Sequence, residues 1–566
     1  MLFPTRPTCR AVLGAAFFVT NVSAQQLSWE TTANNGTIAP GGDPAATFRS
    51  YNQPALNNAG VIVFRARSST GSGAQIDGIY LRDLSGPNPV VKLLARDDVV
   101  PDPNNTLYMG APASFTEFPS TPRIDQDSGL VATRGQHLPV WTYMLGETET
   151  RIGTAGIYAF PQGVPVTGAS LLGSALEADQ VTLSFPWFAV PGAILGTRFD
   201  QFPGSPSATN GRYIVFKGNY TDPVDGLGRT GIYFRDVLPS MPTPYTGLIA
   251  DSNMLIPNQP PGGEVKFGST APPSTAGRYV YFTGLDNEDA PTLGGIYRAQ
   301  IPASPARSSP FTPPLSVMVG IGDPVPGEPP GAVFNGLGEG LSVSSDGNLV
   351  TFWARWGSDT FAKTLYCPTD GNVDLIAFCN ETYPDGLTVD FPVNQGIFVH
   401  NASTGLTYPV ARTLHDGVED LLYWVFSGRP PGVGGPEDTD IEPARWRSSA
   451  FAALSFGVDE PAQVVFKARR NALDGLYLRE GTVFQLPLKV IAEIGVTPGT
   501  SLDPLAPAGS LVSSVGVERD GFRNGRLAIT ASMLYVDPID PKITASWGGI
   551  YTAPVIIDLI FQDGFE

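Results

Sequence analysis

The chain has 566 residues and a formal net charge of −18, which argues against nucleic acid as a ligand because phosphate backbones need a basic surface. Hydrophobic residues make up 42 % of it, so general disorder is excluded. It holds 64 Gly and 54 Pro, an excess that favours many short strands separated by turns.

The first 24 residues are typical of a secretory signal peptide. Arg6 and Arg10 give a positive start, Ala11 to Thr20 are mostly apolar, and Ala24 ends a small-residue cleavage site. This stretch is too short to cross a bilayer, which takes about 20 residues, and no later stretch is longer. We therefore expect an exported monomer, periplasmic or extracellular, with a net charge of −20 once the two arginines are removed.

One short motif recurs seven times along the chain. It reads Gly-Ile-Tyr or a close variant, and it begins at Gly78, Gly156, Gly231, Gly295, Gly396, Gly475 and Gly549. An apolar strand precedes each copy, such as Val61 to Phe64 and Tyr213 to Phe216, and a further apolar strand with an acidic Pro turn follows several copies. Repeats of about four strands, apolar on both faces, predict an all-β fold: a seven-bladed β-propeller of four-stranded blades over residues 25–555.

The ring must also be closed between its first and last blades. Residues 27–37 precede a turn like the one that follows the fourth strand of other repeats, so we expect this N-terminal segment to complete the last blade. Ile556 to Gln562 also read as a strand and offer the competing closure. We assign residues 556–566 to a C-terminal tail.

Ser344 to Phe352 resemble the repeat of TolB-type propellers, with an Asp-Gly turn followed by an apolar strand. The Gly-Ile-Tyr motifs, together with Gly322-Asp323-Pro324, are similar to those of a group of uncharacterised secreted bacterial propeller proteins. The resemblance implies the fold and implies no reaction.

Loop lengths indicate which face of the propeller binds a ligand. The loops between the second and third strands of each repeat are long and varied, notably 135–155 and 355–395, and so are the connectors 174–197 and 413–447. All of these emerge on one face. Since variable loops on a rigid scaffold usually carry binding, we expect the ligand there.

Three sets of residues on that face are candidate sites. Two Asp-Pro-x-Asp loops, with Asp222, Asp225, Asp537 and Asp540, offer oxygen ligands for calcium, although the same sequence simply starts turns. A basic residue ends the second strand in four repeats, at Arg65, Arg134, Lys217 and Lys467, either as a cradle for an anion or as ion pairs within the blades. Trp356 and Trp424, with Trp187, either stack on sugar rings or pin the long insertions.

Two cysteines lie beyond the signal, Cys367 and Cys379. In an oxidising compartment we expect them to form a disulfide that staples a local loop.

No catalytic motif is present: the sequence has no Gly-x-Ser-x-Gly turn, no His-Glu-x-x-His helix, no P-loop and no dinucleotide fingerprint. The leading hypothesis is therefore a binding or scaffold module that recognises a glycan or a protein through its long-loop face. The alternative is a carbohydrate-active hydrolase or lyase with two or three carboxylates in the central cavity.

Overall fold

The structure is a computed structural model of the whole chain. It describes residues 27–41, 45–69, 75–102, 104–105, 112–137, 141–145, 148–152, 155–171, 188–194, 197–238, 246–303, 312–369, 373–427, 444–456, 462–481 and 486–555. The predicted signal peptide, the C-terminal tail and Trp187 lie outside these residues.

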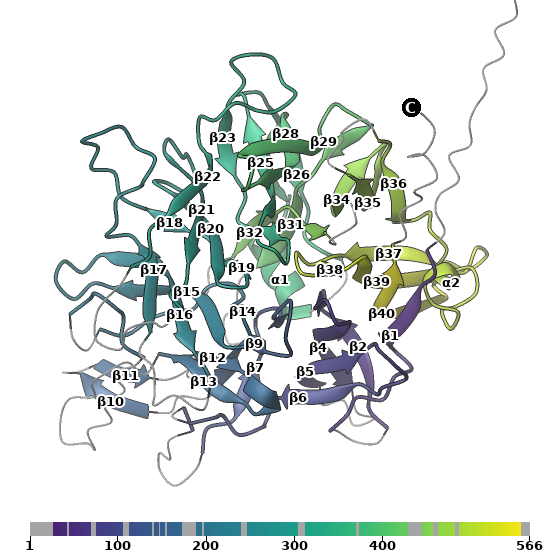
Figure 1. Cartoon of the computed structure of the whole chain (residues 1–566). Helices are drawn as coiled ribbons and strands as arrows, with labels where there is room; N and C mark the ends of the chain where they lie inside the picture. The colour runs from purple at the N-terminus through teal and green to yellow at the C-terminus, as the bar shows by residue number, and fades with distance from the viewer. Residues whose placement is uncertain are drawn as a thin grey trace, which may run out of the picture.

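Seven antiparallel sheets stand around a central axis, as Figure 1 shows, so the predicted seven-bladed β-propeller is confirmed. From the innermost strand outwards, blade 1 holds β2 (Thr47–Tyr51), β3 (Ala55–Leu56), β4 (Val61–Ser69), β5 (Gln75–Asp83) and β6 (Val91–Ala95). Blade 2 holds β7 (Phe115–Glu117), β8 (Arg123–Ile124), β9 (Val131–His137), β12 (Ala155–Ala159) and β13 (Val166–Ser170). Blade 3 holds β14 (Ser207–Thr209), β15 (Tyr213–Thr221), β16 (Gly228–Asp236) and β17 (Gly247–Asp251).

The remaining blades follow the same order. Blade 4 holds β18 (Ser269–Thr270), β19 (Ser274–Ala276), β20 (Tyr279–Leu285), β21 (Gly294–Gln300) and β22 (Ser316–Gly320). Blade 5 holds β23 (Phe334–Leu337), β24 (Ser342–Val343), β25 (Leu349–Trp356), β28 (Gln395–Asn401) and β29 (Leu406–Arg412). Blade 6 holds β30 (Val418–Asp420), β33 (Ala452–Ser455), β34 (Gln463–Arg470), β35 (Leu473–Glu480) and β36 (Lys489–Glu493). Blade 7 holds β37 (Leu511–Gly516), β38 (Phe522–Arg523), β39 (Arg526–Val536), β40 (Thr544–Pro554) and β1 (Glu30–Asn34).

The N-terminal segment supplies the outermost strand of blade 7, because β1 pairs antiparallel with β40. The first and last parts of the described chain are thereby hydrogen-bonded in one sheet. Asn34 adds a side-chain bond, since its Nδ2 donates to Asp503 Oδ2 at 2.8 Å.

In every blade the Gly-Ile-Tyr motif lies in the strand next to the outermost one, that is, in β5, β12, β16, β21, β28, β35 and β40. Its tyrosine folds back over the glycine two residues before it, on the same face of the strand. A Cβ at Gly78 would stand only 2.8 Å from the Tyr80 hydroxyl, and one at Gly231 only 2.7 Å from that of Tyr233. At each of the seven motif glycines a Cβ would also stand 2.3 to 3.1 Å from a carbonyl oxygen of the outermost strand, for example 2.3 Å from that of Val319 at Gly295. The motif therefore recurs because this position has no room for a side chain.

The core lies between the blades. Each of the seven hydrophobic clusters among the described residues joins side chains of two neighbouring blades, for example Val63 of blade 1 with Phe115 of blade 2. Arginines after the motif add polar links: Arg82 donates to the carbonyl of Thr32 on β1 at 2.6 Å, and Arg479 to that of Val410 on β29 at 2.8 Å. Both faces of each blade are thus buried, as the continuous apolar strands predict.

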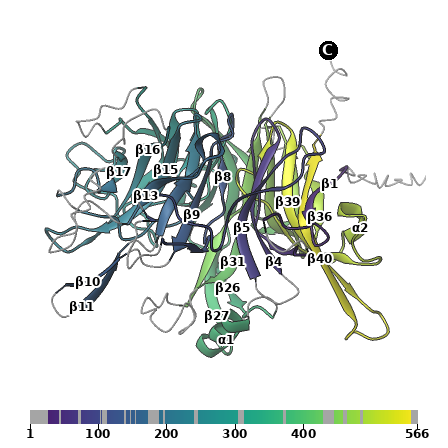
Figure 2. The same ribbon diagram turned by 90° about the horizontal axis from the view of Figure 1, so that it is seen from below.

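The long insertions project from one face of the disc (Figure 2), as predicted. Blade 2 carries the hairpin of β10 (Trp141–Leu145) and β11 (Thr148–Ile152), and blade 5 carries β26 (Thr360–Leu365), α1 (Val373–Thr382) and β27 (Leu387–Pro392). A third hairpin, β31 (Tyr423–Ser427) with β32 (Arg445–Ser449), interrupts the innermost strand of blade 6, between β30 and β33. The prediction that residues 413–447 form a connector between blades was wrong, because β30 already pairs with β34 before the hairpin begins. We call this side the projecting face.

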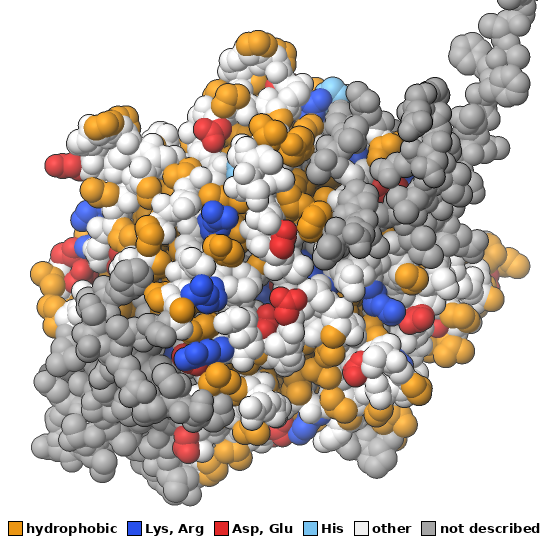
Figure 3. All heavy atoms as spheres, viewed as in Figure 1, with side chains coloured by type: hydrophobic (Ala, Val, Ile, Leu, Met, Phe, Trp, Pro, Cys, Tyr) orange, Lys and Arg blue, Asp and Glu red, His pale blue; other side chains and the backbone are white. Residues whose placement is uncertain are grey.

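The opposite face is flatter and carries apolar, acidic and basic side chains side by side (Figure 3). The remaining short elements are η1 (Pro161–Gly163) and α2 (Gly499–Leu502). Within the described ranges, no helix has the length and apolar character needed to cross a membrane.

Candidate functional site

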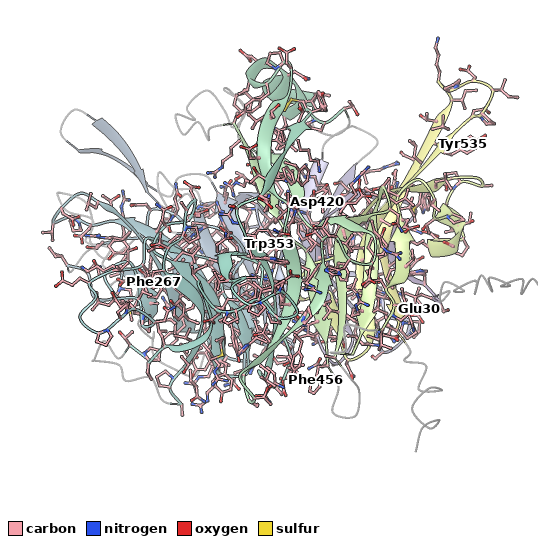
Figure 4. The ribbon with its side chains drawn as sticks, turned by 90° about the horizontal axis from the view of Figure 1, so that it is seen from above. Glu30, Phe267, Trp353, Asp420, Phe456 and Tyr535 are labelled. Atoms are coloured by element: carbon pink, nitrogen blue, oxygen red, sulfur yellow. A yellow bond between two sulfur atoms is a disulfide. The ribbon has the colours of Figure 1, made fainter. Side chains whose placement is uncertain are left out.

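A cleft of about 350 Å³ opens on the projecting face, where blades 4, 5 and 6 meet the base of the insertions. Its wall includes the loop after β20, the break between β23 and β24, the end of β25, and parts of β27, β31 and β32. Trp353, which lines it, lies near this face in Figure 4, whereas Phe456 lies on the opposite face.

The floor of the cleft is the break in the innermost strand of blade 5, Gly338 to Leu341. The Gly338 amide donates to the Trp353 carbonyl at 2.8 Å, and the Thr283 hydroxyl donates to the Gly338 carbonyl at 2.8 Å. A Cβ at Gly338 would meet the Trp353 Cβ at 3.3 Å, so this close approach favours glycine. The break holds the next residue, Glu339, in the cleft wall.

Glu339 is exposed to water, yet protein surrounds it on most sides because it lies in a concave surface. Burial raises the pKa of its carboxyl, and the neighbouring Glu288 raises it further, while Lys217 and Arg519 act in the opposite direction. Glu288 Oε2 accepts from the Ser269 hydroxyl at 3.3 Å.

Trp353 and Trp424 supply the aromatic part of the wall. Trp353 Nε1 donates to Gln395 Oε1 at 3.3 Å, which fixes the orientation of its ring. Trp424 packs on Phe391 of β27, with 5.1 Å between the ring centroids. Trp353 therefore belongs to blade 5, and Trp424 belongs to the hairpin of β31 and β32.

A buried glutamine joins the insertions to the blade. The side-chain nitrogen of Gln395, Nε2, donates to the Pro392 carbonyl at 3.0 Å and to Asp420 Oδ1 at 3.2 Å. Its side-chain oxygen, Oε1, accepts from Trp353 Nε1. Lys363 on β26 adds an ion pair to Asp420 at 3.2 Å. The cleft therefore has walls that are fixed by packing and hydrogen bonds.

The cleft is acidic. Its lining includes the carboxyl groups of Glu288, Asp289, Glu339 and Asp390, and one basic side chain, Arg355. Among the described residues, no group of three or more His, Cys, Asp or Glu side chains is arranged to hold a metal ion.

Beside the cleft, charged side chains meet at the centre of the ring. Arg123 of blade 2 pairs with Glu518 and Asp520 of blade 7, and Asp520 also accepts from Arg523. The Arg519 guanidinium donates to the carbonyls of Pro272, at 3.3 Å, and Pro273, at 3.1 Å, in blade 4. The hydrolase alternative expects an open central cavity lined by carboxylates; at this level the centre instead holds ion-paired, buried charges.

The four predicted basic residues lie at matched positions of the second strand of their repeats, here called strand B: β4, β9, β15 and β34. Arg65 forms an ion pair with Asp77 of its own blade at 3.1 Å, both largely buried. Lys467 donates to the Val515 carbonyl at 3.0 Å and lies over the Tyr423 ring, and burial lowers its pKa to about 8. Arg134 and Lys217 are half-buried in the middle of β9 and β15, because both strands continue beyond the predicted end. Lys217 is close enough to Glu339 to act on its carboxyl.

The two predicted tryptophans lie in different surroundings. Trp424 lines the cleft, whereas Trp356 is only 5 % exposed and packs edge to face on Phe398 in the core between blades 4 and 5. A buried ring of this kind stabilises the blade.

The predicted calcium loops are turns in this structure. Asp222 and Asp225 accept backbone N–H bonds from Val224 and Leu227, each at 2.9 Å, and both carboxylates face Arg229. Asp537 accepts from the amides of Ile539 and Asp540, and Asp540 from that of Lys542. The structure does not bring the two pairs together, and calcium binding stays a prediction.

The predicted disulfide is present. Cys367 and Cys379 are bonded and join the segment after β26 to α1. The insertion that forms part of the cleft wall is thereby cross-linked.

Sequence reasoning missed Glu339 and Asp390, which stand in stretches without a recognisable motif. Two other cleft residues carried a signal. Glu288 belongs to the acidic loop Asp286 to Asp289, and Trp353 interrupts the series of basic residues at the end of strand B. Trp353 could therefore have been found from the sequence, because it stands where other repeats have a basic residue.

Neither protein-family models nor curated protein sequences match this chain. Among solved structures, it is similar to an acylaminoacyl peptidase of Pyrococcus horikoshii, with 11 % identity and a TM-score of 0.35 over 91 % of this chain and 54 % of that one. A prolyl endopeptidase matches with 10 % identity and a TM-score of 0.33 over 89 % and 49 %. The chain spans about half the length of these peptidases, and a likeness this weak says nothing about function. The TolB-type resemblance stays a prediction.

Proposed function

We propose that this protein is a binding propeller that recognises a saccharide in the cleft of the projecting face. The observation that carries the proposal is the joint presence of Trp353, Trp424 and several carboxyl groups around one cavity of about 350 Å³. Flat aromatic rings suit the C–H faces of sugar rings, and carboxylates accept hydrogen bonds from sugar hydroxyls. The volume is within the usual range for small-molecule sites.

The alternative, a glycoside hydrolase, has one observation in its favour: two carboxyl groups, Glu288 and Glu339, face each other in the cleft. Glycosidases hold two such groups about 5 to 9.5 Å apart, to leave room for the sugar and the attacking group.

The disulfide between Cys367 and Cys379 supports an exported protein, because such bonds persist in oxidising compartments. We therefore place the binding propeller in the periplasm or outside the cell, in agreement with the predicted signal peptide.

The test is calorimetric titration of residues 25–566 with neutral cello-, xylo- and N-acetylchito-oligosaccharides. For a saccharide that binds, Trp424→Ala should weaken the affinity about tenfold or more, since it removes a stacking ring, and Trp424→Phe should retain most of it. Tyr366→Ala removes a 72 % exposed aromatic ring that does not line the cleft, and it should bind like the unchanged protein. Equal binding by correctly folded Trp424→Ala would contradict the proposal.

A further inference from the structure

A second cavity, of about 320 Å³, adjoins the cleft on the projecting face. The two cavities share three lining residues, Pro291, Arg355 and Pro392, so together they form one groove. This groove runs between the loop after β20 in blade 4 and the insertion of blade 5. Each cavity alone is within the usual range for a small molecule, so the groove has room for a ligand built from more than one such unit.

Hydrogen bonds fix the walls of the second cavity on both sides. In the loop of blade 4, Thr292 donates its hydroxyl to Asp286 Oδ2 at 2.5 Å and its amide to Asp286 Oδ1 at 3.0 Å. On the side of blade 5, the Asn335 side chain donates to the Gly357 carbonyl. The second cavity is therefore formed before any ligand binds, as most small-molecule sites are.

The lining of the second cavity differs from that of the cleft. Ser358 and Thr360 supply hydroxyl groups and Asn335 supplies an amide, whereas the tryptophans line the cleft alone. Hydroxyl and amide groups both donate and accept hydrogen bonds, which suits the hydroxyl groups of a sugar. The second cavity thus offers polar contacts to the same class of ligand for which the cleft offers aromatic rings.

Arg355 lies where the two cavities meet, and its side chain is half-buried. Its stem lies against Gly336, where a Cβ would stand 2.8 Å from Arg355 Cγ, so the glycine leaves room for the arginine. Within the part of the chain that the structure describes, no group forms a hydrogen bond or an ion pair with this guanidinium. Its five N–H donors are therefore available to a ligand.

We infer that the groove binds a linear saccharide chain, with consecutive parts of the chain in the two cavities and Arg355 donating to the oxygens near the link between them. Neighbouring units of such a chain are joined through a single oxygen, so they occupy adjacent sites. Trp353 and Trp424 hold one part of the chain by stacking, and the polar second cavity holds the next by hydrogen bonds. This inference rests on the proposed saccharide-binding function and adds the length of the ligand.

The experiment titrates residues 25–566 with cello-, xylo- and N-acetylchito-oligosaccharides of two and of six units. In a series that binds, we expect the hexasaccharide to bind about tenfold more tightly than the disaccharide, because only the longer chain reaches both cavities. Thr360→Tyr is designed to fill the second cavity with a ring, and it should lower the affinity for the hexasaccharide to that for the disaccharide. Ala362→Tyr, on the same face of β26 but outside both cavities, should change neither affinity.

Arg355→Met keeps an unbranched stem and removes the N–H donors. It should weaken binding of the hexasaccharide about tenfold, because hydrogen bonds from a charged group are lost.

Equal affinities for the two lengths in the unchanged protein, or a gain with length that persists in Thr360→Tyr, would overturn this inference and leave the saccharide-binding proposal standing. The same holds if Arg355→Met binds the hexasaccharide as tightly as the unchanged protein does. If no saccharide of either length binds, both proposals fall.

Discussion

Several charged side chains are buried at the centre of the ring. Asp520 is 9 % exposed and lies between Arg123, which is 3 % exposed, and Arg523, which is also 3 % exposed. Burial alone would raise the pKa of Asp520, but attraction to Arg123, Arg523 and Arg519 outweighs it and holds the pKa below its ordinary value. The stabilisation from these pairs is therefore present above the ordinary pKa of an aspartate and is lost as the pH falls through the lowered pKa.

Asp520→Asn should destabilise the protein by about 3–5 kcal/mol at neutral pH, because it leaves two buried guanidinium groups short of their counter-charge. Urea denaturation measures this directly. The matched control is Asp474→Asn, which removes an exposed ion pair with Arg469 and should cost less than about 1 kcal/mol. Similar losses in the two variants would show that the central pairs contribute no more than a surface pair.

At the scale of elements, the insertion of blade 5 is a small unit of its own. Strands β26 and β27 pair only with each other, α1 lies between them in the chain, and the disulfide joins the two sides. It is fastened to the propeller through Gln395 and Asp420. Since it has few links to the blades, its stability depends on the disulfide more than theirs does.

Replacing both cysteines, Cys367→Ser with Cys379→Ser, should therefore loosen the insertion without unfolding the ring. Loop entropy assigns about 3 kcal/mol to a cross-link over a loop of this length. Hydrogen exchange should become faster in β26, α1 and β27 and stay unchanged in β15 and β16 of blade 3. An equal acceleration in all the blades would contradict this account, as would no acceleration in the insertion.

For the whole molecule, the sequence was sufficient for the architecture because every blade repeats one steric requirement, a glycine that lies against a carbonyl oxygen of the outermost strand, such as Gly78 against that of Leu94. The binding cleft follows no such rule. Glu339 and Asp390 both belong to blade 5, one in a strand break and the other in the inserted hairpin, and only the folded chain brings them into one cavity. For Arg65 the repeat pattern left two alternatives, an anion cradle or an ion pair within the blade, and the structure pairs it with Asp77.

The central claim is that ligand binds in the cleft of the projecting face. Hydrogen exchange of residues 25–566, with and without a saturating concentration of an oligosaccharide that binds in the titrations, tests it most directly. The account predicts slower exchange in 286–293, 336–341, 388–392, 421–424 and 448–450, which surround the cleft, and no change in the turns 57–60 and 344–348 on the opposite face. Protection confined to the opposite face, or found only at the Asp222 and Asp537 loops, would contradict it.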